Sequence, residues 1–501
     1  MFRKVLIANR GEIAVRVART LQQLGIRAVA VFSDADKGSV HVAQADEAYP
    51  LEGNTSAETY LRGDKIIDVA RRCHADAIHP GYGFLSENAT FAQACKDAGI
   101  VFIGPTPENI RAMGDKIVAK RMAEKAGVPV VPGWSWEGPP NYARIREQAR
   151  RLGYPVLIKA AAGGGGKGMR VVREESGLTE AVEGAQREAA SSFADGRVFL
   201  EKYLDRPRHV EIQIFGDHHG NVVHLFEREC SIQRRHQKIV EESPSPALNP
   251  ETRKHMGEAA VQLAKTISYA NAGTVEFILD QNGTFYFLEV NTRLQVEHPV
   301  TEMVTRRDLV AVQIQVASGE PLPFRQEDLF QVGHAMECRV CAEDPCHGFV
   351  PSVGTIEQFV APNGGDVRAD CGVAAGSKVS VYYDSMLAKL IVWGSTREEM
   401  LRRMTWALER FVVLGVTTNL EFLQSLVQHP EFRAGRLHTG FLEEHAIAPS
   451  VDDIVPDEAW IIAAMAVRGS QSSSNEGSRR KSGDDTVNVG PWVAGGGWRA
   501  T

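Results

Sequence analysis

The chain has 501 residues, of which 24% are charged and 43% are apolar, and its formal net charge is −7 at pH 7. The length predicts about three domains at the usual ~100–200 residues per domain. The charge gives no reason to expect nucleic acid as a partner, and no apolar run approaches the ~20 residues of a membrane span, so we expect neither kind of association.

The first hundred residues alternate between apolar strands and amphipathic helices. Strand, helix and strand are predicted over residues 4–9, 12–24 and 27–32, followed by helix, strand, helix and strand over 66–73, 76–79, 91–98 and 100–104. This order predicts a doubly wound parallel sheet. The first strand begins without a preceding leader peptide, so we expect a cytoplasmic protein. No Gly-x-Gly-x-x-Gly follows that strand, so a dinucleotide site is not expected.

Four consecutive glycines, Gly163 to Gly166, lie between a predicted strand that ends at Lys159 and another that begins at Met169. Their N–H groups can converge on phosphate oxygens without obstruction by side chains. Because a strand rather than a helix follows, and Gly-x-x-x-x-Gly-Lys-Ser/Thr is absent, the segment differs from a P-loop. It predicts a phosphate-binding hairpin, although a hairpin tip without a ligand would also explain the glycines taken alone.

Two further segments carry polar groups that could bind a ligand. The segment 199–204 contains Glu201 and could form an apolar slot for an adenine ring, or it could be an ordinary strand end. Residues 229–238 are predicted to form one short loop, for which a solvated turn is the alternative. The cations and amides of this loop include Gln233, His236 and Lys238.

The segment 285–298 changes from an apolar strand to charged and amide side chains at every second position. Because successive side chains of a strand point to opposite faces, this spacing predicts one polar row. The row consists of Glu289, Asn291, Arg293, Gln295 and Glu297. Burying it is costly unless ligands pair with it, so a binding site is favoured over a solvated strand face. Glu276, on the predicted strand 271–279, would complete an oxygen-rich site suited to Mg²⁺.

The seven cysteines are an odd number, and we expect them to be reduced thiols. Cys338, Cys341 and Cys346 have part of the spacing of a zinc site, but a second ligand pair is missing from the sequence around them, so zinc is not expected. Cys230 lies among the polar segments, and we expect it to have a structural role.

Several of these segments resemble a known family. Residues 154–166 and 287–294 resemble the two signatures of ATP-grasp enzymes of the biotin carboxylase and carbamoyl phosphate synthetase groups. The segments that resemble biotin carboxylase in particular are 8–14, 79–88, 227–238, 293–298 and 335–340. The resemblance extends over residues 1–447.

The resemblance implies an ATP-grasp fold of α/β class, α+β in part. The fold would contain an N-terminal Rossmann-like doubly wound parallel sheet, a mobile lid subdomain and a C-terminal α/β domain. The implied ranges are 1–113 for the N-terminal domain, 114–203 for linker helices and lid, 204–330 for the catalytic ATP-grasp domain, 331–447 for the C-terminal domain, and 448–501 for a mostly disordered tail with the start of a further domain.

The same resemblance implies a role for each candidate residue. ATP would be bound by Lys116, Lys159, Gly163, Gly164, Gly165, Gly166, Glu201, Lys202, Leu204, His209, Gln233 and His236. Mg²⁺ or Mn²⁺ would be held by Glu276, Glu289 and Asn291. Bicarbonate would be bound by Lys238, Arg293, Gln295 and Val296, and deprotonated by Glu297. Arg339 would stabilise the biotin enolate, with Tyr82 close to biotin.

The implied activity is ATP-dependent carboxylation of biotin with bicarbonate through carboxyphosphate, the first half-reaction of an acyl-CoA carboxylase of the acetyl-, propionyl- or methylcrotonyl-CoA type. Expected partners are a biotin carboxyl carrier domain or protein, a carboxyltransferase subunit, and a second copy of the chain in a homodimer or larger complex. The segment 492–499 resembles α chains of the methylcrotonyl-CoA type in particular.

Two alternatives to this activity stay open. The chain could be another ATP-grasp ligase, of the carboxylate-amine or carbamoyl type, which would need an amine donor. It could also be a non-catalytic module that docks a carrier, which would be expected to lack Lys238, Glu297 or Arg339. All three of these residues are present.

Overall fold

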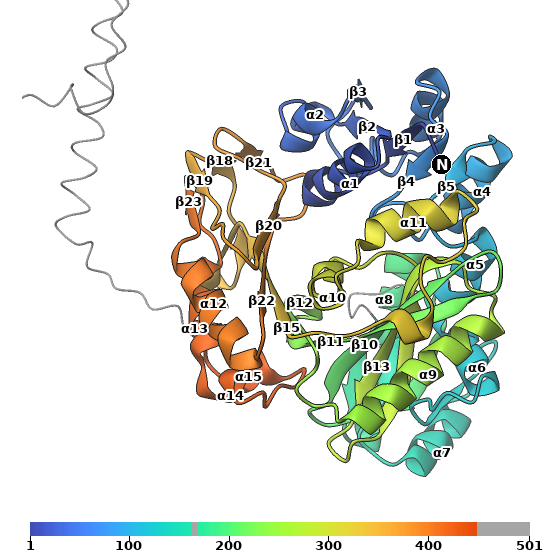
Figure 1. Ribbon diagram of the computed structural model, residues 1–501. Coiled ribbons are helices and arrows are strands. Elements are labelled where there is room, and N and C mark those ends of the chain that lie inside the picture. Colours follow the sequence, from blue (N-terminus) through green and yellow to red (C-terminus); the bar gives the residue numbers. More distant parts are fainter. Residues whose placement is uncertain (163–167, 448–501) are drawn as a thin grey trace, which may run out of the picture. The chain divides into compact units, whose positions relative to one another are not determined.

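The computed structural model describes residues 1–162 and 168–447 (Figure 1). Two predictions fall outside the described residues: the phosphate-binding tip at Gly163 to Gly166, and the mostly disordered tail 448–501. Among the helices that are described, none has the length and apolar character needed to cross a membrane.

The N-terminal part is a five-stranded parallel sheet with the order β3-β2-β1-β4-β5. Its strands are β1 (Lys4–Ile7), β2 (Arg27–Phe32), β3 (Glu47–Pro50), β4 (Ala77–His79) and β5 (Val101–Phe102). The helices are α1 (Gly11–Gln23), α2 (Val40–Gln44), α3 (Gly63–Arg72) and α4 (Ala89–Asp97). The predicted doubly wound sheet is confirmed. The sequence pattern does not predict β3 and α2, because both are short and β3 is a partly exposed edge strand without an apolar run.

A smaller sheet with its own core follows α5 (Pro107–Gly114) and α6 (Lys116–Lys125). Its order is β6-β9-β7-β8, with β6 (Gly133–Ser135), β7 (Val156–Ala160), β8 (Arg170–Val172) and β9 (Val198–Lys202). The helices α7 (Tyr142–Leu152) and α8 (Leu178–Phe193) pack on it through Ile145, Val182 and Leu200. The strands β7 and β8 that flank the glycines are antiparallel, as predicted. That this unit moves as a lid stays a prediction.

The largest sheet has eight antiparallel strands in the order β14-β13-β10-β11-β12-β15-β22-β20. The strands are β10 (Arg208–Gly216), β11 (Val222–Arg234), β12 (Gln237–Ser243), β13 (Asn271–Leu279), β14 (Phe285–Asn291), β15 (His334–Cys341), β20 (Val367–Cys371) and β22 (Met386–Gly394). The helices α9 (Pro250–Thr266), α10 (His298–Thr305) and α11 (Leu309–Ala317) accompany them. Because β12 pairs with β15, one sheet continues across residue 330.

The remaining elements of the C-terminal part lie beside the end of this sheet that is formed by β15, β22 and β20 (Figure 1). The strands are β16 (Glu343–Asp344), β17 (Val350–Pro351), β18 (Gly354–Thr355), β19 (Gln358–Val360), β21 (Lys378–Val379) and β23 (Val412–Leu414). The helices are α12 (Arg397–Glu409), α13 (Leu420–Gln428), α14 (Pro430–Arg433) and α15 (Phe441–Glu444). The helix α12 packs on β15 and β22 through an apolar core that includes Met336, Leu390 and Met404.

The predicted polar row is not one continuous strand. The strand β14 ends at Asn291, and residues 292–297 form a loop that leads into α10. The backbone leaves the sheet here because the N–H of Thr292 donates to Glu87 at 2.9 Å, and Leu294 is buried in the core on the way. The prediction of a single strand face is therefore wrong beyond Asn291.

The prediction of one loop over 229–238 is also wrong. The strands β11 and β12 form a hairpin there, and the turn consists of Arg235 and His236, whose φ angles of 49° and 66° are left-handed. Such a turn usually carries Asn-Gly or Asp-Gly, so the residues Arg235 and His236 do not predict it. Lys238 consequently lies on a strand, opposite Gln233.

Candidate active site

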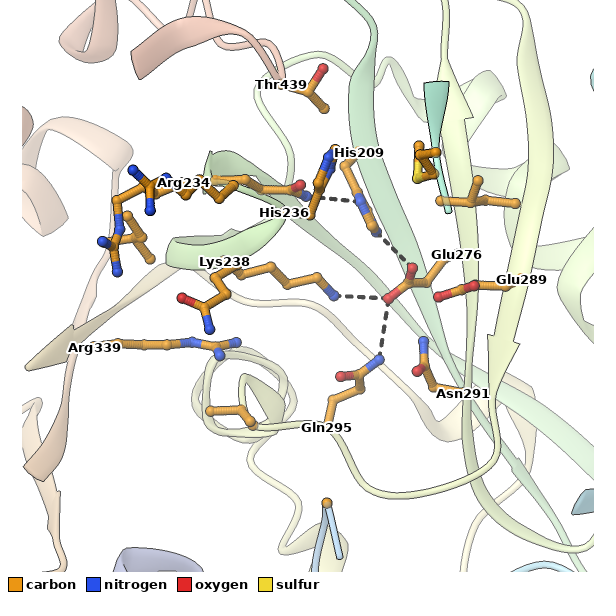
Figure 2. A pocket seen from close by; sticks show the side chains of 18 of the residues that line it. His209, Arg234, His236, Lys238, Glu276, Glu289, Asn291, Gln295, Arg339 and Thr439 are labelled. Carbon is orange, nitrogen blue, oxygen red and sulfur yellow. Dashed lines mark hydrogen bonds and ion pairs between the residues drawn. The ribbon is translucent and has the colours of Figure 1, made fainter. Parts of the chain in front are cut away.

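A cavity of about 1180 Å³ is lined by the smaller sheet, the eight-stranded sheet and the loop 292–297. Each described candidate residue of the sequence analysis lines it, with the exception of Glu297. Glu297 is fully buried and contacts two of the lining residues, Lys238 and Arg339. The fold thus brings all the described candidates to one place. Figure 2 shows His209, His236, Lys238, Glu276, Glu289, Asn291, Gln295 and Arg339 among them.

The ammonium of Lys238 lies among three buried carboxylates. Its Nζ donates to Glu211 at 2.6 Å, to Glu276 at 2.9 Å and to Glu297 at 2.6 Å. Burial opposes charge on the lysine, but the three carboxylates outweigh it and raise its pKa well above the usual value. Burial likewise opposes charge on Glu276 and Glu297. Lys238 outweighs it together with His209 at Glu276 and with Arg339 and Arg228 at Glu297, so the pKa of each carboxyl lies well below its usual value. Lys238, Glu276 and Glu297 are therefore charged at neutral pH.

Oxygen donors gather beside Lys238 on β13 and β14. Glu276 pairs in register with Glu289, and Asn291 follows on the same strand (Figure 2). Glu276 also accepts from Gln295 at 3.3 Å and lies 3.2 Å from Nε2 of His209. Two carboxylates and an amide are the donors that Mg²⁺ prefers, so the residues fit this ion. The group of His209, Glu211 and Glu276 is compact enough to hold a metal as well, but Lys238 donates to both of its carboxylates.

The loop 292–297 holds a guanidinium and an amide at the cavity wall. Arg293 donates to Asn291 at 2.9 Å and to Gln295 at 3.0 Å, and its Nε donates to Glu87 at 2.7 Å. Glu87 therefore fixes both the backbone and the guanidinium of this loop. The guanidinium is planar, so its geometry matches that of a small planar oxyanion better than the geometry of an ammonium group does.

Arg339 on β15 reaches the same carboxylate as Lys238. Its Nη2 lies 3.0 Å from Glu297, and its Nε donates to Glu241 at 2.8 Å. Burial raises the pKa of Glu241 to about 7, although Arg339 opposes the rise. Tyr82 lines the same cavity. Glu297 is thus a buried base candidate between two cations.

The residues predicted to bind nucleotide line the same cavity. Lys159 and Lys120 both donate to Glu201, at 3.0 and 2.8 Å, and Lys116 pairs with Glu289. Burial opposes charge on Glu201, but the two lysines outweigh it and lower its pKa. The ammonium of Lys202 is bound instead to the carbonyl of Gly153 at 2.7 Å. The other described residues predicted to bind nucleotide also line the cavity, and they are Leu204, His209, Gln233 and His236.

The sequence analysis did not assign roles to several residues that hold this site together. Arg228 is fully buried and donates to Glu211 at 2.5 Å and to Gln213 at 2.7 Å. The others are Glu87, Lys120, Glu211, Glu241 and Lys389. The sequence could have indicated two of them. Glu87 lies in the segment 79–88, which resembles biotin carboxylase, and Glu211 is a polar residue that alternates with apolar residues on β10. Arg228 also lies in a segment that resembles biotin carboxylase, 227–238, but the sequence did not indicate its partners Glu211 and Gln213.

The cysteine thiols make none of the contacts given above, although Cys341 lines the cavity and the carbonyl of Cys230 accepts from Gln233 at 2.9 Å. All seven are free, which confirms the expected thiols, and Cys230 is fully buried beside the site. Burial raises the pKa of its thiol well above the usual value, so the thiol stays neutral.

Sequence models of three protein families match consecutive parts of the chain. They are "Biotin carboxylase, N-terminal domain" over residues 1–110, "Carbamoyl-phosphate synthase L chain, ATP binding domain" over 115–325, and "Biotin carboxylase C-terminal domain" over 337–444. Together the three matches leave only short gaps before the end of the described residues.

Known proteins are similar over the same range. The chain is 50% identical to the methylcrotonoyl-CoA carboxylase subunit alpha of Dictyostelium discoideum, over 99% of the chain and 70% of the relative, and it spans 63% of the Mus musculus counterpart. It is 52% identical to the biotin carboxylase of Halalkalibacterium halodurans, over 89% of the chain and 98% of the relative. The biotin carboxylase domain dimer of Hydrogenobacter thermophilus 2-oxoglutarate carboxylase, solved with MgADP and bicarbonate, is 48% identical with a TM-score of 0.86, over 89% of this chain and 98% of that one.

The charge arrangement around Lys238 predicts a pH-dependent loss of stability when it is replaced. Lys238→Gln should lower the free energy of unfolding by ~3–5 kcal/mol at pH 7, because it leaves buried carboxylates without their cation. Between pH 7 and pH 5 the lowered pKa values of Glu276 and Glu297 keep both carboxylates ionised in the parent protein. In the variant, Lys238 no longer opposes the effect of burial, so the pKa of these carboxyls rises, and their protonation as the pH falls relieves the unpaired buried charge. The difference between the two proteins should therefore shrink from pH 7 to pH 5 in urea unfolding.

Lys254→Gln provides the control, because Lys254 forms only an exposed pair with Glu258 on α9. Its effect should stay within ~0.5 kcal/mol at either pH. A Lys238→Gln protein that is as stable as the parent, or whose deficit grows towards pH 5, would contradict the assigned charges.

Proposed function

Because the chain belongs to the biotin carboxylase family, we propose that its cavity carries out the ATP-dependent carboxylation of biotin through carboxyphosphate. The observation that supports this best is the convergence of Lys238 and Arg339 on Glu297, next to the Arg293 loop. A base flanked by two cations and a guanidinium suits the activation of a small oxyanion.

Bicarbonate would lie against Arg293, Gln295 and the N–H of Val296, with Lys238 facing it from the sheet. Glu297 is ionised and can take the bicarbonate proton. The resulting oxygen nucleophile would attack the γ-phosphorus of ATP, which releases ADP and forms carboxyphosphate. Lys238 neutralises charge that builds up in this step, as a preformed electrostatic partner.

The nucleotide would lie between the smaller sheet and β13. Lys116 and Lys159 supply cations for its phosphates, and Glu276, Glu289 and Asn291 would hold Mg²⁺, which neutralises and aligns the β- and γ-phosphates. The described contacts give Glu201 an indirect role, since it holds Lys159 and Lys120 in place. Lys202 could contribute through its backbone, because its ammonium is bound to Gly153.

Arg339 serves the second half of the reaction in this proposal. Carboxyphosphate would split into carbon dioxide and phosphate, and the phosphate would take the proton of the ureido nitrogen of biotin. Negative charge then moves to the ureido oxygen. A fixed guanidinium stabilises such an oxyanion, and the nitrogen then attacks carbon dioxide. Tyr82, on the same side of the cavity, would contact the biotin ring.

Biotin would arrive on a carrier domain or protein, and a carboxyltransferase would use the product. The relatives named methylcrotonoyl-CoA carboxylase subunit alpha extend beyond this chain, so an acyl-CoA carboxylase of that type is the whole assembly that we propose. A homodimer is proposed by analogy with the Hydrogenobacter thermophilus domain, whose structure is described as a dimer. The cytoplasmic location stays a prediction, because the methylcrotonoyl-CoA relatives are named as mitochondrial.

We expect ADP release by the purified protein to require both bicarbonate and Mg²⁺ and to rise with free biotin. The reason is that candidate residues for nucleotide and for an oxyanion line one cavity, so phosphoryl transfer needs both ligands. A coupled ADP assay with each component omitted in turn tests this. The proposal fails if ADP appears equally fast without bicarbonate in a preparation freed of contaminating ATPase.

Arg339→Ser and Lys238→Gln should separate the two halves of the reaction. Arg339→Ser should reduce biotin carboxylation by ~10²–10³-fold while most of the slow bicarbonate-dependent ATP hydrolysis remains, because the enolate forms after phosphoryl transfer. Lys238→Gln should reduce both activities. Carboxybiotin formation and ADP release are measured on the same samples, with Arg402→Ser on the exposed face of α12 as the control. Equal loss of both activities in Arg339→Ser would rule out the assigned division.

A further inference from the structure

A lysine that the proposed reaction does not use is fully buried next to the site. Lys389 lies on β22, directly opposite Arg339 in the register of β15 and β22. Its exposure is 0%. An ammonium in such a place is costly unless specific partners compensate for the lost water, so its contacts indicate why it is there.

Lys389 contacts three segments that come from different parts of the chain. Its Nζ donates to the carbonyl of Val296 at 2.9 Å and lies 3.3 Å from a carboxylate oxygen of Glu12, near the start of α1. The same atom lies 5.8 Å from the centre of the Tyr82 ring. One side chain thereby joins the loop 292–297, the N-terminal sheet domain and the proposed biotin side of the cavity.

Glu12 depends on this lysine for its charge. It is buried, and among the residues described here neither of its carboxylate oxygens has a hydrogen bond. Burial raises the pKa of Glu12 to about 7, and Lys389 is the strongest influence in the opposite direction. Glu12 therefore acts as a counterion for Lys389, while the directed hydrogen bond of the lysine goes to the loop.

The bonded carbonyl has a particular place in the loop. It belongs to the peptide group that joins Val296, whose N–H is the proposed bicarbonate donor, to Glu297, the proposed base. Because a peptide group is planar, fixing its oxygen fixes the orientation of the link between these two residues. Lys238 and Arg339 hold the side chain of Glu297, but the described contacts of both reach its carboxylate and not this backbone.

We propose that Lys389 is a positioning residue for bicarbonate, which holds the Val296–Glu297 peptide so that the Val296 N–H and the Glu297 carboxylate face the same substrate. This inference rests on the proposed function and adds a residue to it. Lys389 itself does not touch the reacting atoms. Its effect should appear in the binding of bicarbonate and not in the binding of ATP, because the described contacts of Lys389 are with Val296, Glu12 and Tyr82, none of which is proposed to bind ATP.

The test is the kinetics of bicarbonate-dependent ADP release by Lys389→Met, which keeps the shape of the side chain and removes the donor. We expect the KM for bicarbonate to rise by ~10-fold or more, as for the loss of a charge-assisted hydrogen bond, while the KM for ATP changes by less than about twofold. Lys378→Met, an exposed lysine on β21, is the matched control and should change neither constant.

Two further variants separate positioning from a purely structural role. Glu12→Gln keeps the bond from Lys389 to Val296, so its KM for bicarbonate should stay close to that of the parent protein. Glu12→Gln combined with Lys389→Met removes both buried charges together, which avoids an unpaired carboxylate if the single Lys389 variant does not fold. The double variant should show the raised KM for bicarbonate.

An unchanged KM for bicarbonate in the Lys389→Met protein or in the double variant overturns the proposal. So does an equal rise of both KM values, or a Glu12→Gln protein with the same defect as the lysine variants, since each would indicate general packing. If the parent protein releases ADP without bicarbonate, the proposed function has failed and not the positioning role alone.

Discussion

The site depends on the pairing of one ammonium with three carboxylates that come from three separate places in the fold. Glu211 on β10, Glu276 on β13 and Glu297 before α10 all accept from Lys238 on β12. Burying four charges is unfavourable unless every one is paired, so the strands must keep their register for the protein to be stable. This requirement links the stability of the eight-stranded sheet to the geometry of the site.

The surrounding charges extend the same arrangement outwards. Arg228 donates a hydrogen bond to Glu211, and Arg339 donates one to Glu297. Glu87 accepts one from Arg293. Cations and carboxylates therefore alternate from the sheet to the loop before any substrate binds. Because these dipoles and charges are already oriented, little reorganisation is needed when negative charge moves during the reaction. The proposed role of Lys389 fits this arrangement, since its hydrogen bond to the carbonyl of Val296 also fixes the backbone of the loop 292–297.

The sequence predicts the parts of this structure that depend on local pattern. The apolar alternation in the first hundred residues predicts the parallel sheet, and the resemblance of short segments identifies candidate residues that, with the exception of Glu297, line the cavity where they are described. Alternation misled where polar residues continue past the end of β14, because the loop after Asn291 shares the two-residue spacing of a strand. The sequence pattern did not predict the turn at Arg235 and His236 because neither residue type is typical of left-handed backbone.

The contacts that hold the site could not be read from the sequence. Arg228 with Glu211, and Lys389 with Glu12, join residues that are far apart along the chain, and a single charged residue in an apolar strand does not reveal its partner.

The most direct test of the central claim follows one oxygen atom. With ¹⁸O-labelled bicarbonate, attack by a bicarbonate oxygen on ATP predicts that the released phosphate carries one ¹⁸O atom per turnover. Phosphate whose new oxygen comes only from water would show plain ATP hydrolysis and would contradict the account.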